Sequence, residues 1–356
     1  MAITDANAME AVIEMNRDNF DMKESLYLTI LSIFANKGTF RSYFSIIFTA
    51  PRVTQLFSGK PVAHSSGVLS AIGRVVSKFF SIEIESSTFS NCGLGKDCSL
   101  NPLTMKVQYG SDFHLEFPEN RKFLTRNPLK VVAEILVLAG DIVSFREMEK
   151  AREFFDFVSY HYSKVFWVPG NHEYYGSDIT EKPVPLWEDV RYNVHLVNNQ
   201  LVDYGGFRFI FSTLWSRISP LLGWDIQRSI ADFSAISWAG GNFTSYRFGL
   251  LHRQSLKFLK NALQTAGGTQ SIVVTHHVPT LMNYPSVYKN SPLTEAFAVE
   301  LRDLIDVSGP NWWIYGHHHV NTPDFQIGRT RMLTNQLGYV HHHEHGSFRR
   351  DLVLKN

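Results

Sequence analysis

The sequence predicts an α/β domain in residues 105–356, preceded by an extension of a different kind. From Met105 onward, short apolar runs alternate with segments of helical spacing, which is typical of sheets covered by helices. Most of these apolar runs end at a short polar motif rich in Asp, Asn or His. Residues 1–104 show neither feature, since they are rich in Ser and Phe and their apolar residues have no clear period. We therefore divide the chain at about residue 104.

The extension, residues 1–104, carries no recognisable chemical motif. From Ser25 to Ile82 it contains six Lys or Arg residues and no Asp or Glu. Cys92 to Leu103 has the Gly, Asn, Ser and Pro content of a linker. Three interpretations stay open: a small helical cap on the second part, an extension that meets a partner or an anionic lipid surface through its basic stretch, or a segment upstream of the true start at Met105.

Composition limits the classes of function. With 44% hydrophobic residues, 19% charged residues and a net charge of +1, the chain resembles a soluble globular protein without a strong field for nucleic acid or membrane. The N-terminus lacks the pattern of a signal peptide, and the most apolar segment, Leu26 to Ala35, is too short to cross a bilayer. Cys92 and Cys98 form no disulfide framework or metal motif. We expect a cytoplasmic protein, with nucleic-acid and membrane partners disfavoured and the oligomeric state open.

The elements of the second part follow in order along the chain. Five apolar runs have the length of buried strands: Lys106–Tyr109, Glu134–Leu138, Lys164–Val168, Ser271–Thr275 and Trp312–Tyr315. Asn193–Phe211 is typical of a hairpin with Gly205-Gly206 as its turn. Helical spacing covers Arg146–His161 and Leu250–Ala266, the second of which meets a stop at Gly267-Gly268.

Five polar motifs, each directly after an apolar strand-like run, carry the chemistry. They are Ser111-Asp112-Phe113-His114, Gly140-Asp141, Gly170-Asn171-His172-Glu173, Thr275-His276-His277 and Gly316-His317-His318-His319. Ligands collect at the carboxyl ends of strands in α/β sheets, so motifs far apart in sequence can converge. Asp, Asn and His are the side chains that suit divalent metals with mixed oxygen and nitrogen ligands.

The motifs together predict two metal ions rather than one. Asp112 and Asp141 supply only two negative charges against two divalent ions, so the site would stay positive and attract a phosphate. Asp141 is the best candidate to bridge the ions. Because Asp112 and His114 are two residues apart, as are His317 and His319, a turn rather than a strand must aim each pair at one point.

The ordered set D-x-H, G-D, G-N-H-E, H and G-H-x-H resembles the calcineurin-like metallophosphoesterase superfamily over residues 105–356. The resemblance implies a four-layer αββα sandwich of two mixed sheets flanked by helices. It implies two divalent metal ions (Mn, Fe, Zn or Co) and hydrolysis of a small phosphate ester, monoester or diester, by a metal-bridging hydroxide. His172 would protonate the leaving group or steady the transferring phosphoryl group. Metal one would take Asp112, His114, Asp141 and His319; metal two would take Asp141, Asn171, His276 and His317.

The chain departs from the family pattern at Ser144. Protein Ser/Thr phosphatases place there the carboxylate that partners the catalytic histidine, and purple acid phosphatases place a metal-binding tyrosine at the same offset. Serine can do neither, so His172 lacks its expected partner and an Fe(III)–tyrosinate centre is disfavoured. The chain is most similar to small bacterial phosphoesterases of undefined substrate.

Several side chains near the motifs keep two interpretations. His277 competes with His276 as a ligand, although the family pattern H-x-x-P places His276 first. His318 points away from the metals or lines the pocket. Glu116 and Glu173 orient ligating histidines or are ordinary surface carboxylates. The run His341, His342, His343 and His345 resembles a metal cluster but also fits a solvated loop or a pocket wall.

Two other functions stay open. A nuclease would use the same ligands, but the near-neutral charge of residues 105–356 disfavours it. A non-catalytic interaction module on the same fold would be expected to lose ligands or the catalytic histidine, whereas this sequence keeps them all.

Overall fold

The computed structural model describes residues 105–265 and 270–355, together with four strands of the extension as backbone. The chain divides into two compact units, residues 1–99 and 100–356. In the first unit the strands pair antiparallel in sequence order: β1 (Met9–Met15), β2 (Leu26–Ser32), β3 (Ser45–Ala50) and β4 (Val53–Ser58). Its described elements are thus strands, whereas one of our alternatives was a helical cap. The linker Cys92 to Leu103, with both cysteines, lies outside the described residues, and the functional boundary at residue 104 stays a prediction.

The second unit contains two mixed sheets. The five-stranded sheet has the order β5 (Val107–Gly110), β6 (Ile135–Ala139), β7 (Lys164–Val168), β9 (Val194–Asn198) and β8 (Leu186–Arg191). The six-stranded sheet has the order β10 (Gln200–Tyr204), β11 (Phe207–Ser212), β14 (Gln270–Thr275), β15 (Trp312–Tyr315), β17 (Thr330–Thr334) and β16 (Phe325–Ile327). Among the described strands of these two sheets, the antiparallel pairs are β8–β9, β10–β11 and β16–β17. A two-stranded ribbon joins β12 (Ser237–Trp238) to β13 (Gly241–Asn242).

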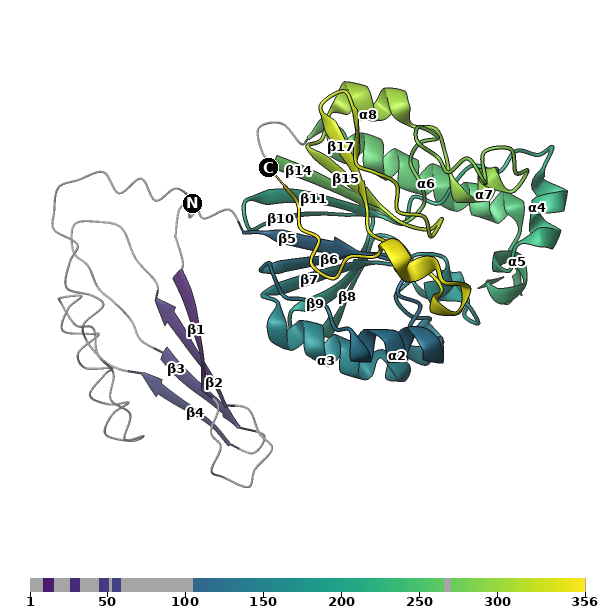
Figure 1. Ribbon diagram of the computed structural model, residues 1–356. Helices are drawn as coiled ribbons and strands as arrows, with labels where there is room; N and C mark the ends of the chain where they lie inside the picture. The colour runs from purple at the N-terminus through teal and green to yellow at the C-terminus, as the bar shows by residue number, and fades with distance from the viewer. Residues whose placement is uncertain are drawn as a thin grey trace, which may run out of the picture. The chain divides into compact units, whose positions relative to one another are not determined.

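Helices cover the outer faces of both sheets, which completes the αββα sandwich that we expected (Figure 1). The five-stranded sheet carries α2 (Pro118–Arg126) and α3 (Arg152–His161), and the six-stranded sheet carries α6 (Ser245–Gln264) and α8 (Arg302–Ser308). Shorter helices are α4 (Gly223–Ser229), α5 (Asp232–Ala235) and α7 (Thr294–Phe297). The 3₁₀ segments are η2 (Phe145–Ala151), η3 (His172–Tyr174), η4 (Ile179–Glu181), η5 (Val340–His342) and η6 (Glu344–Ser347).

The main core lies between the two sheets. Phe166 of β7 contacts Phe209 and Phe211 of β11, with ring centroids 5.4 and 5.0 Å apart, and all three side chains are buried. On the outer faces, Phe155 of α3 packs on the ring of Trp167, and Leu259 of α6 belongs to the cluster around Trp313. Apolar residues on both faces of a strand therefore become buried, which explains the continuous apolar runs of the sequence.

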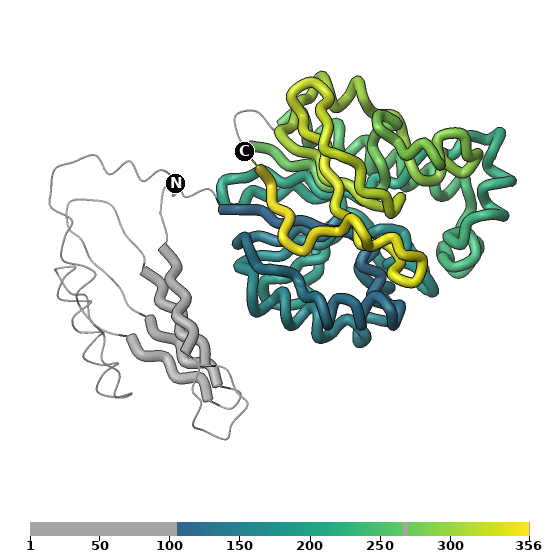
Figure 2. Tube along the Cα trace, in the orientation of Figure 1, coloured from purple at the N-terminus to yellow at the C-terminus, as the bar shows by residue number. Residues whose placement is uncertain are grey.

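The C-terminal segment connects the two sheets at the site. After β17 it passes beside β5, where the Ser111 N–H donates to Asn335 O and the Gly338 N–H donates to Asp112 O. This segment is yellow in Figure 2, where it crosses between the two layers. Tyr339 and the residues after it consequently lie next to the loop that follows β5.

The structure also corrects some element boundaries. The Gly205-Gly206 turn is confirmed, with φ of 61° and 86°, but it joins only β10 to β11. The predicted hairpin was too long because β9 belongs to the other sheet and the chain changes sheets at Asn199, whose φ is 51°. Helix α6 begins earlier than expected, since the Thr244 hydroxyl caps it by accepting from the Arg247 N–H. Among the described residues, we find no helix with the length and apolar character needed to cross a membrane.

Candidate metal centre

The five motifs converge at one edge of the sandwich, beyond the carboxyl ends of five parallel strands. Asp112 follows β5, Asp141 follows β6 and Asn171 follows β7, while His276 follows β14 and His317 follows β15. All five side chains are buried, between 0% and 7% exposed. The parallel course of these strands in both sheets explains how residues so distant in sequence meet.

Tight turns aim the side chains, as the two-residue spacing predicted. Asp112, His114, Asp141, His317 and His319 all have positive φ, between 46° and 81°. Such backbone is uncommon outside glycine and persists only where the surroundings hold it. The Asp112 N–H donates to Gly140 O, and the His114 N–H donates to Asp141 O, so the loops after β5 and β6 hold one another.

Two glycines let these loops approach closely. A Cβ at Gly140 would lie within 3 Å of the His276 ring, and a Cβ at Gly170 would clash with Asp141 and His276. The glycine of each motif thus leaves the space in which the neighbouring polar side chains sit.

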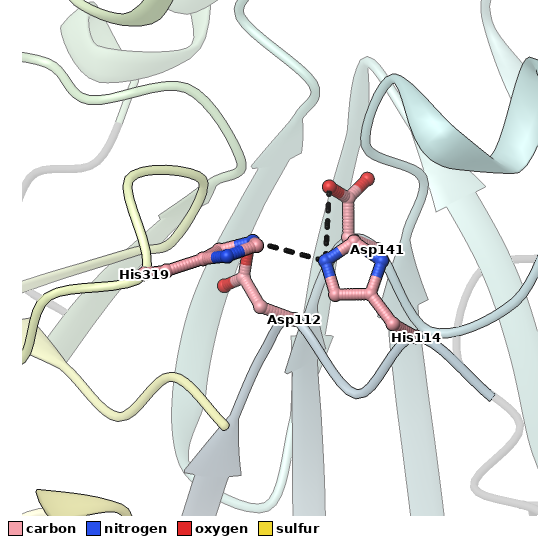
Figure 3. Close-up of side chains that lie close together, drawn as sticks. All are labelled: Asp112, His114, Asp141 and His319. Atoms are coloured by element: carbon pink, nitrogen blue, oxygen red, sulfur yellow. Dashed lines mark hydrogen bonds and ion pairs between the residues drawn. The ribbon is translucent and has the colours of Figure 1, made fainter. Parts of the chain in front are cut away.

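The first cluster comprises Asp112, His114, Asp141 and His319 (Figure 3). Nε2 of His114 lies 3.0 Å from Nε2 of His319 and 3.8 Å from Oδ2 of Asp141. Nε2 of His319 is 3.4 Å from Oδ1 of Asp112. Two oxygen and two nitrogen donors therefore face a common point.

The second cluster comprises Asp141, His276 and His317, with Asn171 beside them. Nε2 of His276 lies 3.3 Å from Oδ2 of Asp141, 3.1 Å from Oδ1 of Asn171 and 3.1 Å from Nδ1 of His317. Asp141 belongs to both clusters, which is the arrangement expected of a bridging ligand.

The donor set fits divalent cations. Facing imidazole nitrogens at about 3 Å need a proton or a cation between them. The other nitrogen of each ring is engaged: Nδ1 of His276 donates to Ala139 O at 2.9 Å, Nδ1 of His114 to Glu116 at 3.0 Å and Nδ1 of His319 to Glu344 at 2.7 Å. These bonds leave Nε2 of each ring directed at the cluster, as ligating histidines require.

The carboxylates dominate the electrostatics of the centre. Burial acts to lower the pKa of His319, but Asp112 and Glu344 outweigh it and raise that pKa to about 10. Burial opposes ionisation of Asp141 in the same way, yet the neighbouring histidines, His276 above all, hold its pKa well below the usual range. The centre therefore keeps ionised carboxylates in a buried position, where a cation is strongly favoured.

His172 belongs to a third group of donor atoms, with His114 and Glu116, and to neither of the two clusters that share Asp141. Its backbone N–H donates to Oδ1 of Asp141 at 3.0 Å, and its ring stacks on Tyr175 with centroids 4.1 Å apart. Nδ1 lies 3.2 Å from Glu116, and Nε2 lies 3.2 Å from the hydroxyl of Tyr339. The ring is thus fixed on three sides.

Glu116 provides the carboxylate that Ser144 lacks. The Ser144 hydroxyl donates to Tyr175 O, away from His172. Glu116 accepts from both His114 and His172, and these bonds outweigh burial and lower its pKa to about 2. Burial disfavours protonated His172, but Asp141 and Glu116 prevail and raise its pKa above the usual value.

Glu173 is a buried clamp between two loops of the site. Its carboxylate accepts from the backbone N–H groups of Asp141, Ile142 and Gly170 and from Nε1 of Trp167, at 2.6 to 3.1 Å. Burial and the charge of Asp141 raise its pKa to about 8, whereas the four donors favour the ionised form. The surface alternative is therefore wrong for both Glu116 and Glu173. Glu116 bonds His114, as the other alternative expected, whereas Glu173 bonds backbone groups and Trp167 and no histidine.

Replacing Glu173 by Gln should destabilise the protein. The side-chain NH₂ of glutamine would face two N–H donors, each of which would lose its acceptor at a cost of roughly 1–3 kcal/mol. We expect the free energy of unfolding, measured by urea denaturation, to fall by about 2–6 kcal/mol. Glu149→Gln is the matched control, because the Glu149 side chain is 82% exposed. Equal urea denaturation midpoints for Glu173→Gln and Glu149→Gln would contradict the role of Glu173 as a clamp between the two loops.

The remaining alternatives are resolved by position. His277 is buried behind the clusters, with Nδ1 3.3 Å from Thr213 O, and belongs to neither. His318 bonds Gln336 and also lines the adjoining cavity. His341, His342 and His343 are exposed and His345 is half-buried, and none of the four enters a metal cluster found among the described residues.

Sequence reasoning missed two carboxylates of the centre. Asp232 of α5 is buried and accepts from the Tyr175 hydroxyl at 2.6 Å and from Nδ2 of Asn171 at 2.8 Å, so Oδ1 of Asn171 faces His276. Glu344 fixes His319. Nothing in the sequence marked Asp232, whereas Glu344 lies inside the histidine run that we had singled out.

A cavity of about 650 Å³ adjoins the clusters. Asp141, Asn171, His172, His317 and His319 form one side of it. The cavity gives a small molecule access to the metal centre.

A four-layer αββα sandwich with Asp, Asn and His side chains that converge at its strand ends is the arrangement typical of metallophosphoesterases. The chain belongs to the calcineurin-like phosphoesterase family, whose model matches residues 107–321.

Two comparisons place the chain among known proteins. It is 31% identical over 265 residues to the uncharacterized protein L509 of Acanthamoeba polyphaga mimivirus. This match covers 66% of this chain and 91% of that protein. The crystal structure of phosphopantetheinyl hydrolase from Mycobacterium tuberculosis superposes with a TM-score of 0.50 at 17% identity, covering 66% of this chain and 89% of that chain. This second likeness concerns the fold.

Proposed function

We propose that the protein hydrolyses a small phosphate ester, monoester or diester, with two divalent cations drawn from Mn, Fe, Zn or Co. The observation that carries this proposal is the pair of donor clusters that share Asp141 beside a cavity of small-molecule size. Asp112, His114, Asp141 and His319 would hold one ion, and Asp141, Asn171, His276 and His317 would hold the other. Such a pair of ions, when bound, lowers the pKa of a shared water and stabilises charge on the phosphoryl oxygens.

In this proposal His172 handles the proton of the leaving group. Ionised Glu116 accepts from Nδ1, so Nε2 is the nitrogen that can donate, and it is the one nearest the Tyr339 hydroxyl. Stacking on Tyr175 restrains the ring, so its position does not depend on the substrate. Protonated His172 would give its proton to the departing oxygen and would favour negative charge there.

Other functions have less support. No Lys or Arg lines the cavity within the described ranges, although a nuclease needs cations along the strand backbone. An interaction module has no need for ligands, a bridging carboxylate and a fixed proton donor together.

A substrate panel would test the proposed function. The chelated protein is assayed with monoesters, diesters, nucleotides and single-stranded DNA, with Mn²⁺, Fe²⁺, Zn²⁺ and Co²⁺ each added back. We expect hydrolysis of small esters that returns only with metal. Hydrolysis restricted to DNA would favour the nuclease, and inertness with every metal would leave the interaction module.

We also propose that residues 105–356 suffice for activity, because every metal-site residue lies there. The fragment should hydrolyse an aryl phosphate ester with Mn²⁺ within a factor of about two of the full chain, since it keeps every described residue of the metal clusters and of the cavity. A soluble, metal-loaded but inert fragment beside an active full chain would instead assign the extension a functional role.

A further inference from the structure

The cavity beside the metal clusters has a wall that the reaction itself does not require. Its far side comes from residues 229–232 at the end of α4 and the start of α5, and from residues 284–297 around α7. At about 650 Å³ it exceeds the space of one phosphate and falls within the roughly 300–1,000 Å³ typical of small-molecule sites. The wall therefore has room for an organic group attached to the phosphate.

Charge on this wall disfavours a second phosphate. Among the described residues that line the cavity there is no Lys or Arg, the usual partners of phosphate groups. Asp232 contributes a carboxylate to this wall, and Glu344 contributes one elsewhere on the cavity lining. Both are already bonded within the protein, Asp232 to Tyr175 and Asn171, and Glu344 to His319 and the Tyr339 N–H. A second phosphate bound against this wall would meet the carboxylate of Asp232 and no Lys or Arg.

Aromatic rings make up much of the same wall. Tyr284 and Tyr288 lie with ring centroids 6.5 Å apart and planes at 57°. Phe297 of this wall stacks on His317 at 4.6 Å. Elsewhere on the cavity lining, Phe117 meets Tyr339 edge to face at 5.4 Å. Such rings bind planar or apolar groups by stacking and by excluding water.

We infer that the substrate carries one phosphate, esterified to an uncharged planar or apolar group that the aromatic wall holds, and that a second phosphate on this group is rejected. The inference rests on the proposed function and names its substrate class. It assigns the discrimination between substrates to the wall formed by residues 229–232 and 284–297. The metal centre would contact the phosphoryl group, which all of these esters share.

A matched pair of esters tests the charge selection on the full-length, metal-loaded protein. Thymidine 5′-(p-nitrophenyl phosphate) is compared with the same compound carrying a 3′-phosphate, so the leaving group and the reacting phosphorus are unchanged. We expect kcat/KM to be at least about tenfold lower for the doubly phosphorylated ester, because like charges are brought together without a cation. Equal or faster hydrolysis of that ester would overturn the inference.

A charge introduced on the wall should reverse this preference. Leu293, at the start of α7, lines the cavity and is partly exposed. Leu293→Arg should raise the relative kcat/KM of the doubly phosphorylated ester about tenfold, whereas the neutral control Leu293→Gln should keep the original ratio. Equal ratios in the two variants would mean that the wall does not select by charge.

The aromatic part is tested at Tyr288 with two smaller diesters, p-nitrophenyl phenyl phosphate and p-nitrophenyl methyl phosphate. Tyr288→Ala should lower kcat/KM for the phenyl ester, relative to kcat/KM for the methyl ester, roughly five- to hundredfold by loss of stacking. Tyr288→Phe should preserve this ratio. An unchanged ratio in Tyr288→Ala would overturn the role of the aromatic wall. If neither these diesters nor the monoesters of the substrate panel were hydrolysed with any of the four metals, the proposed function would fail, and the inference with it. Hydrolysis with the opposite preferences would defeat the inference alone.

Discussion

The Asp141→Asn variant should lose metal from both clusters at once and lose nearly all activity. Oδ2 of Asp141 lies 3.3 Å from Nε2 of His276 and 3.8 Å from Nε2 of His114, so one carboxylate serves both clusters. Asparagine keeps the size of the side chain but removes the charge and one acceptor. Activity should fall by more than the roughly 10²–10³-fold that loss of one stabilising donor costs.

Metal content by mass spectrometry and the rate on an aryl phosphate ester are measured together for this variant. Asp203→Asn is a matched control, because Asp203 is 56% exposed and pairs with Arg208 on the β10–β11 hairpin. Circular dichroism shows whether each variant is folded. Two tightly held ions per chain in folded Asp141→Asn would refute the bridging role.

The His172→Ala variant should keep both metals and lose a factor of roughly 10²–10⁴ in rate, the typical contribution of a positioned proton donor. The ring belongs to neither of the clusters that share Asp141, and its contacts are with Glu116, Tyr339 and Tyr175. The loss should be smallest for esters of nitrophenol, because a good leaving group departs without a proton.

Rates on nitrophenyl and alkyl esters of the same phosphate separate the two possible roles of His172. His161→Ala is a suitable control, since His161 is an exposed histidine at the end of α3. An equal loss with good and poor leaving groups would show that His172 is not the acid and would assign it an electrostatic or positioning role. Loss of metal in His172→Ala would make it a ligand.

The sequence was sufficient to predict the strands that end at the motifs and the residues that converge there. Lys164–Val168 and Trp312–Tyr315 are strands with the predicted bounds, because buried parallel strands are continuous apolar runs. Short edge strands such as β16 (Phe325–Ile327) were missed, since one exposed face and three residues leave almost no pattern. Helix α6 was recognised from its period, but its first turn was not, because a Thr cap resembles any loop threonine.

The residues that meet in the two clusters could be predicted because motif residues keep a fixed order along the chain, and their role as metal ligands stays a prediction. The supporting carboxylates could not be predicted, because they act through tertiary contacts alone. Asp232 reaches Asn171 from a short helix more than sixty positions away, and Glu344 reaches His319 from the C-terminal segment. Glu116 was noticed only as a neighbour of His114, and the structure shows that it also bonds His172.

The left-handed backbone at the ligand positions has a practical consequence for anyone who wants a catalytically silent version of this protein. Asn, Asp and His tolerate positive φ several-fold better than most residues, so at Asp112 and Asp141 one residue type satisfies both the turn and the cation. Alanine there removes the ligand and also leaves a residue that the turn does not suit, at roughly 1–2 kcal/mol. In an inactive variant made with Ala, loss of activity would therefore be combined with loss of folding stability. Asparagine or glycine at the same position would separate the two.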